Sequence, residues 1–214
     1  MRTALVILAA GALVVSGPAA GAAAKARTAT FGSTLSKPPT NTDPPATCDT
    51  SAVTARDTGP CTRVALGFAA TGAVGNQVRV PFDGVIRRVR IRAGTPGTLR
   101  VTLVRLRNLD RAGGVGEGRE VSHGRTLRVQ TIGEGPPRTV DSFAVGLRAH
   151  QGDYLAVESS SISAMRCEGG DTEQLLFQPP LQPFGAWEQS ETFDDCTLLV
   201  QATITAPRKG KRRR

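Results

Sequence analysis

Four arginine side chains within residues 83–107 (DGVIRRVRIRAGTPGTLRVTLVRLR) have the chemistry to bind an anion. Arg88, Arg90 and Arg92 alternate with apolar residues, and Arg100 follows a short turn. A guanidinium group binds carboxylate, sulfate or phosphate through paired hydrogen bonds. Like charges that face one another on a sheet are destabilising unless an anion or a neighbouring carboxylate offsets them. An anionic ligand is the functional candidate for this patch, whereas neighbouring Asp or Glu on the next strand, or simple solvation, is the favoured interpretation.

Two aromatic residues, Phe184 and Trp187, lie in the proline-rich stretch LFQPPLQPFGAWEQ. An exposed aromatic ring on a loop can stack on a sugar ring, so both residues are candidates for glycan binding. The alternative is that they pack beneath the loop as a small hydrophobic cluster.

Acidic residues near the third and fourth cysteines are candidate ligands for calcium. If Cys167 pairs with Cys196, the carboxylates on either side of the bond come together beside a glycine-rich turn, and such oxygens suit Ca²⁺. The spacing matches no known calcium-binding loop, and solvated loop charge is the alternative. The candidate ligands are Glu168, Asp171, Asp194 and Asp195.

Catalytic motifs are missing from the sequence. His123 and His150 do not have metal-ligand spacing, and no nucleophile motif surrounds the serines at 159–161. Carboxylates that could form a glycosidase acid–base pair are present, as they are in almost any domain. We predict a protein that is not an enzyme, with no cofactor except, as a candidate, calcium.

The elements that must position these side chains are predicted to be β-strands. Residues 83–107 fit two antiparallel strands joined at residues 93–97. Placing Arg92 opposite Thr98 pairs Ile91 with Leu99 and Val89 with Val101 on one face, and Arg90 with Arg100 and Arg88 with Thr102 on the other. One register thus yields an apolar face and an arginine face, as in a half-buried sheet.

Short β-like runs interrupted by glycine or proline continue through the chain, and no segment shows a convincing helical period. We predict an all-β fold, an antiparallel sandwich of jelly-roll type with about nine strands. After Leu103 the apolar positions change parity to Val104 and Leu106. Either a β-bulge or burial of both strand faces would explain that change.

The N-terminal residues resemble an export signal. Arg2 precedes an apolar run and then small residues, which predicts a cleaved signal peptide over residues 1–24. A membrane anchor is the alternative, but the run is short for a membrane span. Residues 25–47 are rich in Thr, Ala and Pro and are predicted to be a disordered spacer. The folded domain is predicted over residues 48–206.

Much of the positive charge is placed at the ends of the chain. Of 27 basic residues, Arg2 and six in the tail at residues 207–214 lie at the two ends, and the rest of the chain carries 20 basic against 18 acidic residues. The tail is predicted to be disordered, with acidic membrane surfaces or wall phosphates as partners and no specific role as the alternative. In an exported protein, nucleic acid is disfavoured as a partner.

The mature chain contains four cysteines, Cys48, Cys61, Cys167 and Cys196. An even number in an exported protein predicts two disulfides, and three pairings are open. The sequence-local pairing, Cys48–Cys61 with Cys167–Cys196, is favoured. A zinc site would require closer cysteine spacing.

Two segments resemble a known group of proteins. VPFDGVIRRVRIRAGTPGTLRVTLVRL is similar to a strand–turn–strand segment of secreted bacterial β-sandwich proteins of unknown function. GLRAHQGDYLAVES resembles the Gly-Asp-aromatic step that begins an inner strand in jelly-roll domains, including carbohydrate-binding modules. The resemblance implies a fold and assigns no binding residues.

The leading functional hypothesis is a secreted, extracellular or cell-wall-associated domain that binds a glycan or an anionic wall polymer without catalysis. The alternatives are a structural or protein-interaction module without a small ligand, and a polysaccharide hydrolase.

Overall fold

The structure is a computed structural model, and it describes residues 26–40, 60–67, 78–94, 96–110, 115–130, 140–159, 164–166, 173–194 and 196–206. These residues form strands and connecting loops, with no helix among them. They therefore contain no helical segment long and apolar enough to cross a membrane. The predicted signal peptide, the tail, Cys48 and Cys167 lie outside the described residues.

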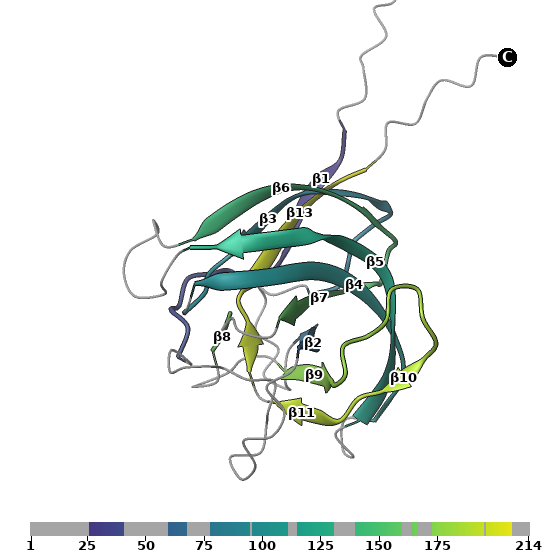
Figure 1. Ribbon diagram of the computed structural model, residues 1–214. Helices are drawn as coiled ribbons and strands as arrows, with labels where there is room; N and C mark the ends of the chain where they lie inside the picture. The colour runs from purple at the N-terminus through teal and green to yellow at the C-terminus, as the bar shows by residue number, and fades with distance from the viewer. Residues whose placement is uncertain are drawn as a thin grey trace, which may run out of the picture.

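A four-stranded antiparallel sheet forms one layer, in the order β1-β13-β3-β6. Every second side chain of these strands points into the core and the others point outward, because side chains alternate along a strand. Figure 1 shows these strands together at the top of the molecule. The strands are β1 (Thr28–Gly32), β13 (Val200–Thr205), β3 (Gly84–Ile91) and β6 (Asp141–Ala149).

A seven-stranded antiparallel sheet forms the second layer, in the order β10-β5-β4-β7-β2-β9-β11. Figure 1 shows β4 and β5 bending strongly, so that their ends approach β10 and β11. The strands are β10 (Glu188–Gln189), β5 (Val115–Val129), β4 (Gly97–Asp110), β7 (Tyr154–Ser159), β2 (Cys61–Gly67), β9 (Glu173–Phe177) and β11 (Thr192–Asp194). A short pair, β8 (Met165–Arg166) with β12 (Thr197–Leu198), completes the strands described.

The core lies between the two sheets. Val89 and Ile91 of β3 are fully buried, and Leu99 and Val101 of β4 are at most 2% exposed. The predicted antiparallel all-β sandwich is therefore confirmed. The jelly-roll topology stays a prediction, and several of the thirteen strands in the described residues are only two or three residues long.

The predicted hairpin over residues 83–107 is wrong. β3 pairs with β13 and β6, whereas β4 pairs with β5 and β7, so the two strands belong to different sheets. The connection between them passes from one layer to the other. A strand on each side of a common core shows the same apolar alternation as two strands of one hairpin, so the pattern could not distinguish the two arrangements.

The seven-stranded sheet, which we call the curled sheet because β4 and β5 bend, buries both of its faces along part of β4. Residues 101–104 are all at most 1% exposed, although their side chains alternate between the faces. The parity change after Leu103 coincides with a register shift against β5 between Leu103 and Val104. The pairing of β4 with β7 continues without a shift there, so the extra residue belongs to β5. Burial of both faces and a bulge in the neighbouring strand therefore act together.

The predicted spacer over residues 25–47 is wrong for residues 28–32. These residues form β1, which pairs with β13, and Phe31 is 2% exposed in the core. Ser33 donates from its backbone to the carbonyl of Val200 at 2.8 Å, which continues the attachment. The small and polar residues of β1 made it resemble a spacer in the sequence. The strand lies at a sheet edge and buries only one large side chain.

Neither cysteine among the described residues, Cys61 or Cys196, carries a free thiol. Their proposed partners, Cys48 and Cys167, lie outside those residues. The two sequence-local pairings therefore stay a prediction.

Candidate anion-binding surface

The outward face of the four-stranded sheet carries a set of polar side chains, which we call the arginine face. The register places Gln201, Arg90 and Ser142 side by side across three strands. The next outward row holds Thr30, Thr203, Arg88 and Ala144. A third row holds Thr28, Thr205, Val85 and Arg148. None of these rows contains an Asp or Glu residue.

A β-bulge adds another cation to this face. The register of β3 against β13 shifts between Ile86 and Arg88, and the extra residue on β3 is Arg87. Ile86 is fully buried, whereas Arg87 and Arg88 are both exposed. A bulge allows two successive residues to project to the same side. The sequence Ile-Arg-Arg-Val therefore becomes an inward, outward, outward, inward pattern.

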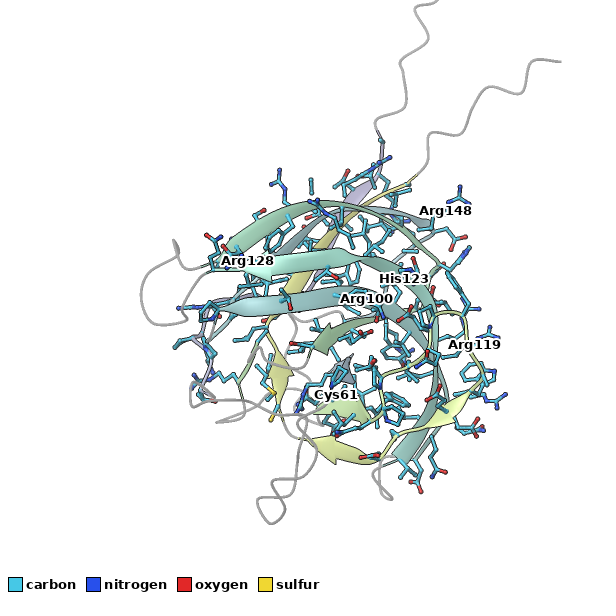
Figure 2. All side chains as sticks on the ribbon, in the orientation of Figure 1. Cys61, Arg100, Arg119, His123, Arg128 and Arg148 are labelled. Atoms are coloured by element: carbon cyan, nitrogen blue, oxygen red, sulfur yellow. The ribbon has the colours of Figure 1, made fainter. Side chains whose placement is uncertain are left out.

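The arginines of this face lack acidic partners in the described part of the chain. Arg90 donates to the Oε1 of Gln201 at 3.1 Å, and Arg87, Arg88 and Arg148 make no hydrogen bond or ion pair there. Arg148 projects away from the body of the protein (Figure 2). Exposed guanidinium groups with no internal partner remain available to an external anion.

The nearest acidic residues lie at opposite ends of this sheet and are occupied by backbone amides. Asp83, just before β3, accepts a hydrogen bond from the backbone of Gln151 at 2.8 Å. Asp141, the first residue of β6, accepts one from the backbone of Gln130 at 2.9 Å. These carboxylates close loops at the sheet ends and leave the middle of the arginine face positive.

The structure does not bring the four sequence-predicted arginines into one patch. Arg92 is 6% exposed, and its Nη1 donates to the carbonyls of Leu35 at 3.1 Å and Ser36 at 3.3 Å. It therefore fastens the segment after β1 to the sheet. Arg100 lies on the other sheet and pairs with Glu158, which is its cross-strand neighbour. The expectation of an exposed patch was wrong for Arg92 and for the grouping with Arg100, whereas Arg88 and Arg90 do share one outward face.

A second polar cluster lies on the curled sheet, around Glu120. The Oε1 of Glu120 is 2.8 Å from the Nδ1 of His123, and Thr102 lies opposite His123 across the strands. Burial raises the pKa of the Glu120 carboxyl, and the hydrogen bond with His123 opposes that rise. Among the described residues, the Oε2 of Glu120 and the Oγ1 of Thr102 are buried and have no hydrogen-bond partner. Figure 2 shows His123 and Arg100 on this sheet.

The two predicted aromatic ligands are placed differently. Trp187 is half-buried, with the guanidinium groups of Arg107 and Arg119 at 4.2 Å and 5.2 Å from its ring centroid. Phe184 is 68% exposed, and no other large hydrophobic side chain among the described residues is exposed. Its ring lies 5.6 Å from that of His123, at 50°. The two residues therefore occupy separate surroundings, and only Phe184 offers a free ring.

The predicted calcium ligands are scarcely covered by the structure. Glu168, Asp171 and Asp195 lie outside the described residues. Asp194 is the last residue of β11, where its backbone pairs with Gln174. The calcium site stays a prediction.

Sequence reasoning missed Arg87, Arg148 and the threonines of the arginine face. A signal for them does exist, because β13 reads VQATIT and β6 reads DSFAVGLRA, each with small or polar residues at every second position. That alternation indicates which side chains point outward. It does not indicate which strands are neighbours, so the face could not be assembled from it.

Comparison with known proteins gives no relative: no family model, no curated protein and no solved structure matches this chain.

Proposed function

We propose that this protein is an exported, non-catalytic domain that binds an anionic polymer of the cell surface through the arginine face. The observation that carries the proposal is the set of outward rows around Arg88, Arg90 and Arg148, which contain cations and hydroxyls but no carboxylate. The candidate ligands are glycans with acidic groups and phosphate-bearing wall polymers.

The shape of this surface favours a polymer over a small molecule. Small-molecule sites are concave and largely apolar, whereas this face is an open sheet. Successive outward residues of a strand are about 7 Å apart, and neighbouring strands are about 4.8 Å apart. Arg88 and Arg90 therefore present two cations along β3, with Thr203 and Gln201 beside them as hydrogen-bonding partners. A chain of repeated anionic groups matches such a grid.

The chemistry of the cations also supports the proposal. Arginine binds carboxylate, sulfate and phosphate in a planar, two-point geometry and is less strongly hydrated than lysine. Contacts of this kind displace counterions from a polyanion, so binding should weaken steeply as salt is added.

The test compares the full chain with charge-matched variants, using a polyanion such as polygalacturonate immobilised on a sensor surface. Changing Arg88, Arg90 and Arg148 together to Gln is expected to weaken binding on the order of a hundredfold at low salt, at about 1 kcal/mol per surface charge. Arg128→Gln is the single-charge control, since Arg128 is exposed on β5, in the other sheet, and carries no ion pair in the described residues. It should be compared with Arg88→Gln alone.

The natural protein and each variant are measured again after removal of residues 208–214, because the basic tail alone could hold a polyanion. The proposal requires that the tail-free protein still binds and that Arg88→Gln weakens it more than Arg128→Gln. Equal effects of the two single changes, or complete loss of binding with the tail, would show that the arginine face has no such role.

A further inference from the structure

A groove runs between the two sheets where β5 and β6 lie close together. Its β5 side is formed by His123, Gly124 and Arg125, and its β6 side by residues 144–147. The volume is about 400 Å³. Small residues open it, since a Cβ added at Gly146 would meet no atom within 4 Å.

The groove is continuous with the arginine face. Ala144 lines the groove and is also the outward neighbour of Arg88 in the row that crosses the four-stranded sheet. Gly146 is the next outward residue of β6, and Arg148 follows it. A linear ligand lying on Arg88 therefore meets no large side chain as it crosses β6 into the groove.

The far side of the groove is held in place by buried groups. His123 lines it, and Glu120 fixes the ring from below through the 2.8 Å contact with Nδ1. Glu120 is fully buried, and one of its carboxylate oxygens has no hydrogen-bond partner in the part of the chain that the structure describes. Nδ1 of His123 is thereby engaged, and the His123 ring lies 5.6 Å from the exposed ring of Phe184.

Phe184 occupies a position that suits glycine. Residues 182–185 form a turn in which the backbone of Gly185 donates to the carbonyl of Gln182 at 2.9 Å, and Phe184 has φ of 55°. A left-handed backbone at this turn position favours Gly or Asn, and a bulky residue there is strained. A phenyl side chain that is exposed to solvent on a strained backbone is unfavourable for folding. A backbone outlier of this kind therefore motivates a functional hypothesis.

We propose that the groove binds a segment of acidic polysaccharide, with its anionic groups on the arginine face and Arg125, and one sugar ring against Phe184 and His123. This inference rests on the proposed function and narrows it. A sugar ring presents C–H groups that pack against an aromatic face. A polyphosphate chain has the charge but no such ring, so the aromatic corner distinguishes the two polymers.

Two variants of the full chain test the groove without changing its charge. Gly146→Leu fills the opening where the structure leaves room, so the protein is expected to fold normally. Phe184→Gly removes the ring and suits the backbone of the turn, so its melting temperature should not fall. Thr98→Leu, on an exposed position of β4 away from the groove, controls for an added leucine.

Binding is measured against polygalacturonate and against inorganic polyphosphate of similar charge. We expect each groove variant to weaken polygalacturonate binding about tenfold, while Phe184→Gly leaves polyphosphate binding within about twofold because polyphosphate has no ring to pack against Phe184. Thr98→Leu should leave both unchanged. If Gly146→Leu failed to fold, Phe184→Gly would still carry the test.

Three other outcomes would overturn the inference, and they differ in what they say of the arginine face. Unchanged polygalacturonate binding by both groove variants, with weakening by the arginine variants, would reject the groove and keep the arginine face. Equal weakening of both polymers by Phe184→Gly would reject a saccharide ring as the occupant. An unmodified protein that binds neither polymer would reject the proposed function itself.

Discussion

The arginines of β3 and those of β4 look alike in the sequence but have opposite surroundings. In β4, Arg100 pairs with Glu158, Arg105 with Asp153 and Arg107 with Glu117. In β3, Arg87 and Arg88 have no acidic partner among the described residues, and Arg90 contacts only an amide of β13. Both strands alternate arginine with apolar residues, so the difference does not originate in the strands themselves.

The difference originates in the neighbouring strands. β4 lies between β5, which supplies Glu117, and β7, which supplies Glu158. Asp153 directly precedes β7. β3 lies between β13 and β6, whose outward residues are Thr, Gln, Ser, Ala, Gly and Arg. Arginine in this protein is therefore structural where its neighbour is acidic and available for a ligand where its neighbour is neutral.

The largest expected effect comes from removing a carboxylate that serves the β4 arginines. Asp153 is 1% exposed and accepts from Arg105 at 2.8 Å and 3.0 Å and from the backbone of His150 at 3.1 Å. Asp153→Ala is expected to lower the free energy of unfolding by about 2–3 kcal/mol, because hydrogen bonds to a buried charge are lost. Urea denaturation measures this, and a loss below about 0.5 kcal/mol would contradict the structural role.

A smaller effect, dependent on pH, is expected at Glu120, whose neighbour is a histidine. Burial raises its pKa above the ordinary 4.5, whereas hydrogen bonds from Asn108 and Arg107 lower the pKa of Glu117, three residues earlier. A raised pKa contributes stability that is complete below pH 4.5 and is lost as pH rises through the folded-state value.

The measurement is the melting temperature of the natural protein minus that of Glu120→Gln, followed as a function of pH. The difference should fall as pH rises above about 4.5, since the variant has no such titration. A difference that stays flat, or that grows with pH, would show that the carboxyl is not destabilised by burial. Glu117 is present in both proteins, so its opposite shift cancels.

The smallest effect is expected on the arginine face. Arg88 is exposed and makes no contact with an acidic group in the described residues, so Arg88→Gln should change the free energy of unfolding by less than about 0.5 kcal/mol. Removing one of several like charges could even stabilise the sheet slightly. A loss above about 1 kcal/mol in urea denaturation would mean that Arg88 has a structural partner, and the contrast with β4 would disappear.

Much of the fold was accessible from the sequence, because its signal is local. Alternation around Val89 and Leu99 correctly indicated which side chains enter the core, and strands matching most of the predicted runs are present. Phe31 shows the limit of that reasoning, since a strand at an edge with one large apolar residue resembles a spacer. The candidate site was predicted only in part, through Arg88, Arg90 and Phe184.

The sequence by itself determined the strand character of most of residues 83–107 and the inward orientation of Val89, Ile91, Leu99 and Val101, because side chains alternate along any strand. Only the tertiary structure decided that β3 and β4 separate into different sheets, that Arg148 joins Arg88 and Arg90, and that Arg100 meets Glu158. The physical reason is that cross-strand neighbours are brought together by burial of a common core. In these cases Arg148 lies 50 or more positions from Arg88 and Arg90, and Glu158 lies as far from Arg100, so no local pattern records them.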